Sequence, residues 1–592
     1  MPGPNLFSAR QAAILDVAGP PEEVARVVTA WRGEVRRFLE AVGWGGESIA
    51  TREFAGGANL VLTAPLDALY AATEVNEAAF AAARAAVGLA ATETTPAESA
   101  GPDFVADVER LRAAIAKESN PRLIALRDAC EEHGVAFVPD EKCVSIGLGK
   151  GSRSFDPAEL PAPASIASSI DWPALHDVPV CLVTGTNGKS TTVRVLAVMA
   201  RAAGKVAGYS STDGVRVGDE LVEKGDYSGP SGARLVVRDP RVEVAILETA
   251  RGGLLRRGLV LRRVDAAAVL NVSEDHLGEF GVASMDDLVD AKLVVRRAVE
   301  RRGTLVLNAE DPRLVARAER FAAEADDEPA FARSIAWFSR DPALPLVQRH
   351  LSAGGMAAVV EGGELVLYRG AAASAAGRGS RRESLLPLAD APITLGGAAR
   401  HNVANLLAAT LLGAQLGFDA AALAGGMRAF RGSSAENPGR GNVVTIGGVT
   451  LIVDFAHNPD SVKAMLELAQ ALPAKRRLLV IGQAGDRDDH AIAEFARAAA
   501  AYRPDRIVIK EMTKYLRGRE PGVIPALLER EFLAAGIAPD AIVRTGSELE
   551  ALDHALSWAR RGDLLLLLTH AERARVLKRL AEMERDGWEP PL

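Results

Sequence analysis

Cysteine is scarce in this sequence of 592 residues, which contains only Cys130, Cys143 and Cys181. Three cysteines cannot form a disulfide framework, and their spacing matches no metal-binding motif. Aromatic residues make up only 5% of the chain, and no run reaches the about 20 consecutive apolar residues that cross a membrane. The N-terminus also lacks the basic start, apolar stretch and small-residue cleavage site of a secretory signal. These absences predict a cytoplasmic protein with no membrane partner.

An excess of positive charge is absent as well. The formal net charge is −8, with 77 acidic and 69 basic residues, whereas binding to a nucleic-acid backbone needs clustered Lys and Arg. We therefore expect no nucleic-acid partner. What the sequence does have is an ordinary globular composition, 48% hydrophobic and 25% charged. A chain of this length is too long for one hydrophobic core, so several domains are expected.

The N-terminal region, residues 1–172, has a pattern of its own. It mixes amphipathic helical patterns, such as 77–87, with short apolar runs, such as 136–139, and predicts a separate α+β domain. The region ends in a segment rich in Pro, Ser and Ala, residues 156–169, which is typical of a linker. We expect this domain to dock substrate or to mediate contacts in a homo-oligomer.

Residues 173–430 alternate short apolar strands with helices. Strands that are apolar on both faces and separated by helices predict a parallel sheet covered by helices on each side. After residue 431 the alternation begins again and predicts a smaller, Rossmann-like α/β domain over 431–592. The fold class is therefore α/β, with a central sheet domain, a C-terminal domain and the separate N-terminal domain.

The clearest chemical motif is LVTGTNGKSTT, where a strand runs into a glycine-containing turn and then a helix. Gly185 and Gly188 leave room for backbone N–H groups to face a phosphate, and the start of the helix adds partial positive charge. Lys189 can reach the terminal phosphates, and the Ser190 hydroxyl can bind Mg²⁺. The usual loop would place glycine at Val183, so this is a shortened variant, and the alternative is an ordinary helix cap. The context favours a P-loop-type ATPase domain whose nucleotide contacts are Gly185, Thr186, Asn187, Gly188, Lys189, Ser190 and Thr191.

Two further strands lead into polar residues. Glu248 ends the strand VEVAILE, and His276 lies in LNVSEDHL after another strand. Ligands in open parallel sheets gather at the carboxyl ends of strands, so an acid there can hold Mg²⁺. The alternatives are a turn cap for Glu248 and a hydrogen-bonded structural histidine for His276. Lys292 lies on an expected helix downstream, where by itself it would be a solvated surface charge.

The motifs GTNGKSTT, ETARGG, SEDHL with a later AK, RHNVANLLAA, NPGR and DFAHNPD follow one another in the order seen in the Mur ligase superfamily. Residues 173–592 therefore resemble this superfamily, which includes the peptidoglycan-building amino-acid ligases and folylpolyglutamate synthase. The segments GDYSGPSGARLVVRDP and GDRDD are similar to the Mur-ligase module of its cyanophycin synthetase branch. The resemblance implies an ADP-forming ligase that turns a carboxylate into an acyl phosphate and joins it to the amine of an amino acid or peptide.

The resemblance also implies roles for matching positions. Lys189 and the amides around it would hold the ATP phosphates, while Ser190 and Glu248 would bind one Mg²⁺. His276 would bind a second metal ion, and Lys292 would be carbamylated so that its new carboxylate orients that ion. The implied catalytic set is Lys189, Glu248, His276, Lys292 and Arg440.

The remaining nucleotide contacts come from later motifs. Asn402 and Asn405 match the adenine-side motif of the superfamily, and Arg440 and Asp454 match residues that contact the phosphates and ribose, with His457 beside them. A hinge over 431–438 would let the last domain close as a lid, which protects an acyl phosphate from water.

The sequence does not determine the two substrates. Arg517 and Arg519 fit the α-carboxylate of the amine substrate and the ATP side equally well, and Arg251 and Arg256 fit either an acidic substrate or plain surface positions. The region before residue 173 is too short for the catalytic ATP-grasp domain of cyanophycin synthetases, so we expect one ligation rather than two. The alternatives are a poly-γ-glutamate or folylpolyglutamate-type glutamate ligase, a catalytically inactive nucleotide-binding scaffold, and a phosphotransferase that makes no amide.

Overall fold

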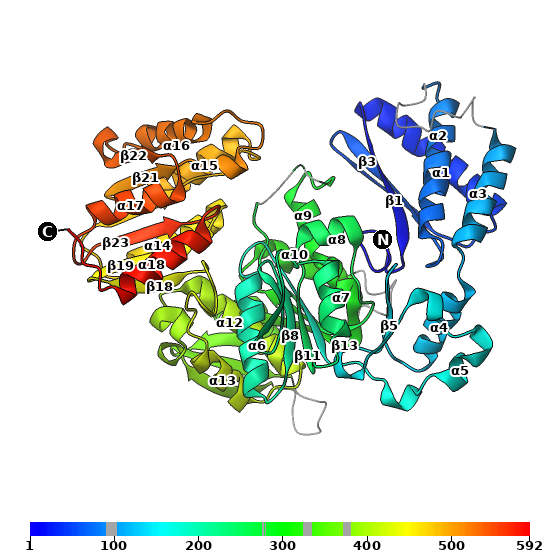
Figure 1. The fold of residues 1–592 in the computed structure, drawn as a ribbon, viewed down its shortest axis with the longest axis horizontal. Helices are drawn as coiled ribbons and strands as arrows, with labels where there is room; N and C mark the ends of the chain where they lie inside the picture. Colours follow the sequence, from blue (N-terminus) through cyan, green and yellow to red (C-terminus); the bar gives the residue numbers. More distant parts are fainter. Residues whose placement is uncertain (90–102, 275–277, 279, 324–333, 371–379, 592) are drawn as a thin grey trace.

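A computed structural model describes residues 1–89, 103–274, 278, 280–323, 334–370 and 380–591 of the chain. A central part lies between an N-terminal part on one side and a C-terminal part on the other (Figure 1). The described residues form one eleven-stranded sheet, one six-stranded sheet and two three-stranded sheets. None of the helices in these ranges combines the length and the apolar character that crossing a bilayer requires.

The first N-terminal sheet is antiparallel, in the order β1-β3-β2. One of its faces packs on two long helices, and the fully buried Trp31 and Phe38 lie in that core. The Trp31 indole donates a hydrogen bond of 3.0 Å to the Asn76 side chain, which satisfies both buried groups. The elements are β1 (Ala12–Ala18), α1 (Pro21–Ala41), β2 (Ile49–Phe54), β3 (Gly57–Thr63), α2 (Leu69–Ala86) and α3 (Phe104–Glu118).

The segment 156–169, which was expected to be a linker, is packed into a small second unit. Leu160 and Ile166 are buried in one cluster with Leu126 and Ile146. Prolines restrict the backbone of this segment, but they do not prevent its spaced apolar side chains from finding a core. The elements of this unit are α4 (Pro121–Glu132), β4 (Phe137–Pro139), β5 (Val144–Ile146), β6 (Arg153–Phe155) and α5 (Ile166–Ser169).

The central sheet has the order β10-β9-β8-β11-β7-β12-β13-β14-β15-β16-β17. From β8 to β15 neighbouring strands are parallel, which confirms the predicted parallel sheet. Antiparallel strands extend both ends, and strand periodicity alone does not specify direction, so these ends were not predicted. The strands are β7 (Val180–Thr184), β8 (Ala207–Ser211), β9 (Gly214–Val217), β10 (Glu220–Lys224), β11 (Val244–Glu248), β12 (Val264–Val269), β13 (Val299–Asn308), β14 (Ser334–Ser339), β15 (Ala357–Glu361), β16 (Glu364–Arg369) and β17 (Arg381–Pro387).

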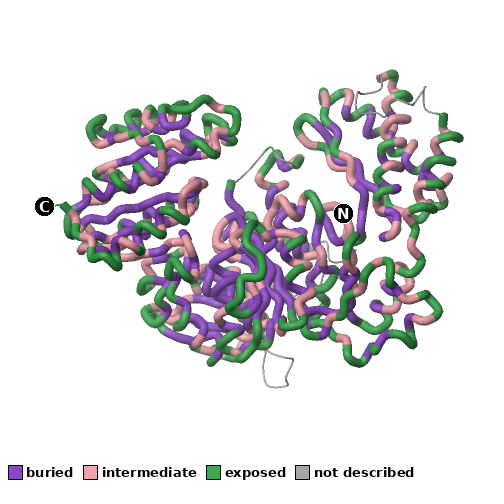
Figure 2. Tube along the Cα trace, in the orientation of Figure 1, coloured by how far each residue is buried: buried purple, intermediate pink, exposed green. Residues whose placement is uncertain are grey.

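Helices cover both faces of the central sheet, whose middle strands β11, β7 and β12 are almost entirely buried (Figure 2). The face formed with α6, α12 and α13 makes one apolar cluster, and the face formed with the remaining helices makes another. The helices of the first face are α6 (Lys189–Ala202), α12 (Arg400–Gln415) and α13 (Ala420–Ala429). Those of the second are α7 (Pro230–Arg238), α8 (Arg251–Arg257), α9 (Met285–Leu293), α10 (Pro312–Ala323) and α11 (Pro345–Ser352).

The C-terminal sheet has the order β18-β19-β23-β20-β21-β22 and is parallel except for β18. Its central strand β23 consists of five leucines, each at most 1% exposed, which confirms the expected buried strand. Helices α14, α15 and α16 cover one face, and α17 and α18 cover the other. The elements are β18 (Asn442–Ile446), β19 (Val449–Asp454), α14 (Pro459–Ala471), β20 (Arg477–Ile481), α15 (Asp489–Ala500), β21 (Arg506–Lys510), α16 (Val523–Ala534), β22 (Ile542–Thr545), α17 (Glu548–Trp558), β23 (Leu564–Leu568) and α18 (Arg573–Arg585).

A glycine sets the close approach of α13 to α6, the helix that begins at Lys189. A Cβ atom at Gly426 would lie 2.5 Å from the Cα atom of Met199, whereas one at the neighbouring Gly425 would lie 3.7 Å from its nearest neighbour, the Ala202 Cβ. We expect Gly426→Ala to destabilise the protein by about 1–3 kcal/mol, because the backbones of two packed helices must move apart. Thermal unfolding measures this effect.

The control is Gly425→Ala, which has room for its methyl group. It should stabilise the same helix by up to about 1 kcal/mol, because alanine is the better helix former. Equal shifts of the unfolding temperature in the two variants would contradict the assigned packing of α13 on α6.

Candidate active site

A cleft of about 1300 Å³ lies at the carboxyl ends of β7, β11 and β12. The central part lines one side of it, and residues 454–465 at the end of β19 and the start of α14 line the other. The polar ends of parallel strands meet at this sheet edge, which is where α/β proteins place their ligands. The cleft gathers Lys189, Glu248, Lys292, Arg440 and Asp454 from distant parts of the sequence.

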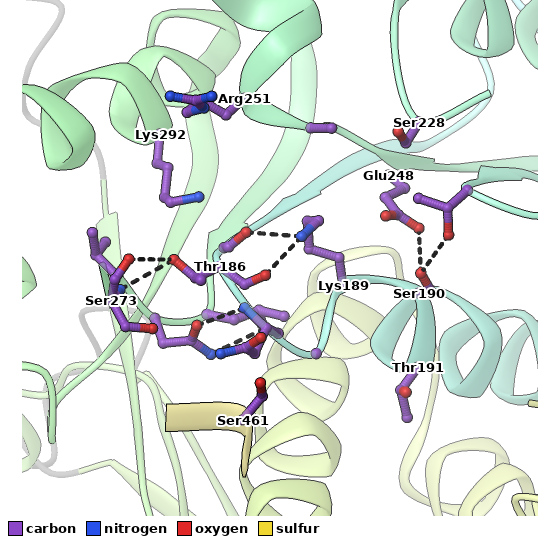
Figure 3. Close-up of a pocket in the computed structure, with 18 of the residues that line it drawn as sticks. Thr186, Lys189, Ser190, Thr191, Ser228, Glu248, Arg251, Ser273, Lys292 and Ser461 are labelled. Carbon is purple, nitrogen blue, oxygen red and sulfur yellow. Dashed lines mark hydrogen bonds between the residues drawn. The ribbon is translucent and has the colours of Figure 1, made fainter. Parts of the chain in front are cut away.

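The loop between β7 and α6 needs glycine at two positions. Gly185 and Gly188 have φ angles of 151° and 89°, in the range that favours glycine. A Cβ atom at Gly188 would lie 2.2 Å from the Asn405 side-chain oxygen. The Lys189 ammonium donates to the carbonyl oxygens of Gly185 and Thr186, at 3.0 and 2.9 Å (Figure 3). This lysine therefore folds back over the loop and holds positive charge at the start of α6.

Glu248 faces the same helix from the end of β11. The Ser190 hydroxyl donates to one Glu248 oxygen, Oε2, at 2.8 Å, and lies 3.2 Å from the Thr212 hydroxyl (Figure 3). The other oxygen, Oε1, is buried and has no hydrogen-bond partner. Burial raises the pKa of Glu248, while the nearby Lys189 acts in the opposite direction. A buried carboxylate oxygen without a partner, beside a hydroxyl, fits the oxygen ligands that Mg²⁺ prefers.

Lys292 lies near the end of α9 and is only 3% exposed, although it lines the cleft. Lys292 and Arg251 lie on one side of Thr186, and Ser461 of the C-terminal part lies on the other (Figure 3). The burial of Lys292 excludes the alternative of a solvated surface charge. Its expected neighbour His276 lies outside the described residues. Within the described ranges, no three His, Cys, Asp or Glu side chains come together in the manner of metal ligands.

The C-terminal wall contributes Arg440 and Asp454, which are half-buried and interact electrostatically. Burial raises the pKa of Asp454 to about 6, against the influence of Arg440. Burial also lowers the pKa of Arg440, whose guanidinium carbon lies 5.0 Å from the centre of the Phe455 ring. His457 lines the cleft, and its ring nitrogen Nδ1 lies 3.2 Å from the Phe455 carbonyl oxygen.

The two asparagines expected at the adenine side have different positions. Asn405 lines the cleft beside Gly188, whereas Asn402 is buried behind it. The Asn405 amide donates to the Asn402 side-chain oxygen at 3.2 Å, and Asn402 in turn donates to the Ile393 carbonyl at 3.2 Å. Asn402 therefore orients Asn405 rather than facing the cleft.

The four arginines whose roles the sequence left open differ in whether they line the cleft. Arg517, Arg251 and Arg256 line the cleft. Arg519 does not, because its guanidinium bonds the Gly485 and Arg487 carbonyl oxygens and the Asp489 carboxylate, at 3.0, 2.5 and 2.5 Å. Arg519 thus fixes a loop of the C-terminal part.

Contacts between the central and C-terminal parts include residues that the motifs did not indicate. Asp213 accepts hydrogen bonds from Arg194 of α6 and from Arg573 of α18, the latter at 2.5 Å. Arg194 also donates to the side chain of the buried Asn437, at 2.8 Å. A lone aspartate in a β-turn carries no sequence signal for such a role. Only Asn437, the first residue of NPGR, lay within a recognised motif.

A pair of amides adds a second connection beside the loop. Asn187 and Asn458 exchange side-chain hydrogen bonds of 3.3 and 3.1 Å. Asn458 also caps α14, and Asn187 is held to the central sheet by Asn271. The loop before α6 is therefore fixed from both sides of the cleft.

Comparison with known proteins identifies the class. Residues 183–328 match the family model of the Mur ligase middle domain, and residues 439–569 match that of the Mur ligase glutamate ligase domain. These two regions of the chain therefore belong to the Mur ligase family.

Within the family the chain is similar to cyanophycin synthetases. It is 38% identical over 392 residues to that of Trichormus variabilis, across 66% of this chain and 41% of the relative. It is also 28% identical over 440 residues to a UDP-N-acetylmuramoyl-L-alanyl-D-glutamate–2,6-diaminopimelate ligase of Chlorobaculum tepidum, across 68% and 78% of the two chains. The chain spans less than half the length of the cyanophycin synthetases that it matches.

A bifunctional folylpolyglutamate synthase/dihydrofolate synthase from Yersinia pestis is 18% identical, with a TM-score of 0.46 over 68% of this chain and 89% of that chain.

Asp213 joins the central and C-terminal parts through its hydrogen bonds from Arg194 and Arg573, so loss of one bond should change how often the two parts separate. Arg573→Ala removes a charge-assisted hydrogen bond between the central and C-terminal parts, worth about 1 to 2 kcal/mol. We expect the C-terminal part to open more often and the radius of gyration in small-angle X-ray scattering to increase. Arg575→Ala is the control, because Arg575 pairs with Glu572 beside it on the surface. An unchanged radius of gyration in Arg573→Ala would contradict a bridging role.

Proposed function

We propose that this chain is an ATP-dependent ligase that converts a carboxylate into an acyl phosphate and joins it to an amine, with release of ADP and phosphate. One observation carries the proposal: the Ser190–Glu248 pair lies beside Lys189, in a cleft whose other wall supplies Arg440 and Asp454. These groups are what transfer of a phosphoryl group to an anionic acceptor requires. The family membership and the similarity to cyanophycin synthetases support the same activity.

The terminal phosphates of ATP would lie at the loop 185–190. The start of α6 presents backbone N–H groups and partial positive charge there, and Lys189 can exchange its two carbonyl contacts for phosphate oxygens. Ser190 and Glu248 would hold one Mg²⁺, with the partnerless oxygen of Glu248 as a ligand. Bound there, Mg²⁺ would neutralise phosphate charge during transfer.

The acceptor carboxylate would approach from the wall formed by α8 and α9. Arg251 and Arg256 line this wall, so an anionic substrate meets opposite charge on entry. Attack of a carboxylate on the γ-phosphorus brings two anions together, and Lys189 and Arg440 would offset that repulsion. An amine then attacks the acyl phosphate to form the amide.

Lys292 would serve a second metal ion together with His276. As a free ammonium, a buried lysine beside this site would repel a cation, whereas a carbamate on its nitrogen supplies anionic oxygen ligands. The burial of Lys292 within the cleft wall supports this proposal, because solvated surface lysines have no such constraint.

The C-terminal part would act as a lid over the nucleotide. Arg440 and Asp454 would contact the phosphates and ribose, with His457 beside them and Asn405 on the adenine side. Closure excludes water, which would otherwise hydrolyse the acyl phosphate. We accordingly propose a division into an N-terminal domain of residues 1–172, an ATP-binding domain of 173–430 and a lid domain of 431–592. Arg517 would hold the amine substrate or the ATP side.

The test of this function is ADP release from the full chain with Mg²⁺-ATP and a panel of acids and amines, with mass spectrometry of the products. Release should require both an acid and an amine. Lys189→Ala should lower turnover by about 10²–10³-fold, because a charge aligned with the transferring phosphoryl group is lost. Lys205→Ala, which removes an exposed lysine just beyond the end of the same helix, should behave as the parent protein. ADP release without any condensed product would contradict the ligase proposal.

The carbamate proposal makes a separate prediction. Lys292→Ala should lose at least about 10²-fold in turnover, because oxygen ligands for a metal ion disappear. Formate or acetate should restore part of the activity, since a small carboxylate can enter the space that the lysine leaves. Lys189→Ala should gain nothing from the same acids, which controls for a general salt effect. Absence of any rescue in Lys292→Ala would argue against a carbamate.

A further inference from the structure

The first N-terminal sheet has a second face, which is turned toward the central part of the chain (Figure 1). The face opposite α1 and α2 carries a polar row in register across the three strands, formed by Asp16, Asn59 and Arg52. Asn59 is 4% exposed and donates a hydrogen bond of 2.6 Å to Asp16, while its side-chain oxygen lies 3.4 Å from an Arg52 nitrogen. Arg52 is thus oriented within its own sheet and extends from it.

Arg52 contacts the segment that leads into α9. Its Nη2 atom donates to the Gly281 carbonyl oxygen at 2.7 Å and lies 2.7 Å from an Asp287 carboxylate oxygen. Asp287 is the third residue of α9 and forms a capping box with Ser284, so it fixes the start of that helix. Lys292 lies on the same helix. Arg52 therefore contacts both the segment that precedes α9 and the first turn of α9.

An aromatic contact reinforces this arrangement. Gly281 has a φ angle of 70°, and a Cβ atom there would lie 2.8 Å from the ring of Phe54, which follows Arg52 by two residues on β2. The edge strand of the N-terminal sheet therefore presses directly on the backbone before α9. A larger residue at position 281 would push the two parts away from each other.

Residues near the N-terminus contact the end of α8, which together with α9 forms the substrate-side wall of the cleft. The Leu259 amide donates to the Pro4 carbonyl at 2.7 Å, just after Gly258, the C-cap residue of α8. A Cβ atom at Gly258 would lie 2.7 Å from the Pro4 oxygen, so backbone meets backbone without intervening side chains. Arg262, further along the same segment, donates to the Gln11 side chain at 2.6 Å.

We infer that the N-terminal region sets the position of α8 and α9, and that Arg52 is a positioning residue for Lys292 and for the substrate-side wall of the cleft. Helices α8 and α9 have seven and nine residues, and helices this short are not stable on their own. Their placement depends on tertiary contacts, and the N-terminal region supplies contacts to both. This role is distinct from substrate docking or contacts between copies of the chain, and its catalytic part rests on the proposed ligase activity.

The first test requires no substrate. Amide hydrogen exchange of the full-length protein, followed by mass spectrometry, reports local opening of individual helices. In Arg52→Ala we expect exchange in α9 to be at least about tenfold faster, with α6 and α12 unchanged. Asp287→Asn removes the same ion pair from the other side and should have the same effect, even where Arg52→Ala disturbs the N-terminal sheet. Arg32→Ala is the matched control, because Arg32 bonds Thr51 within the N-terminal part.

The second test uses the acid and amine that the product screen identifies. Arg52→Ala should lower kcat about tenfold or more and raise KM for the acid, with KM for ATP within about twofold of the parent value. Arg52→Lys should recover part of the loss, because it keeps the charge but cannot make both contacts with one planar group. Arg32→Ala should match the parent.

Two results would overturn the inference. One is exchange in α9 that is the same in Arg52→Ala as in Arg32→Ala. The other is a rise of KM for ATP in parallel with the loss of kcat, which indicates general damage. If no acid and amine pair is ligated at all, the ligase proposal fails, while the exchange experiment still decides whether Arg52 positions α9.

Discussion

The buried carboxylate of Glu248 imposes the central constraint on this cleft. A carboxylate enclosed by protein needs compensating charge or donors, and its surroundings supply Ser190 on one oxygen and Lys189 nearby, but nothing on the other oxygen. The loop before α6 also passes close to Asn405, which leaves no room for a side chain at Gly188. The remaining polar side chains of the cleft are arranged around this carboxylate and the positive end of α6.

Both outer parts of the chain meet the central part at this same edge. The C-terminal part is attached through Asn458 to the loop and through Arg573 to Asp213. The N-terminal part is attached through Arg52 to the start of α9. The contacts named for the C-terminal part join polar side chains, whereas the N-terminal part also places Val138 and Leu148 in an apolar cluster of the central part. Polar contacts can break and re-form at a modest free-energy cost, which suits the lid role that we propose for the C-terminal part.

The sequence located residues of the cleft where a chemical motif lies at the end of a predicted strand. Lys189 and Glu248 could be placed because a buried strand ends directly before the loop or at the acid, and the carboxyl ends of parallel strands share one edge. Asn402 shows the limit of this reasoning: its motif pointed to the nucleotide, yet the helix turns its side chain behind Asn405. The segment 156–169 shows another limit, because composition indicated a linker while Leu160 and Ile166 are buried.

By itself the sequence determined the α/β class, the order of the regions and the position of the P-loop-type loop, because each depends on local periodicity or on a short motif. Only the tertiary structure decided which arginines face the cleft, as the contrast between Arg517 and Arg519 shows. It alone brought Asp213 to Arg573 and Arg52 to Asp287, pairs that are hundreds of residues apart. Such pairs are single side chains of common types, and nothing local distinguishes them from other surface charges until the chain has folded.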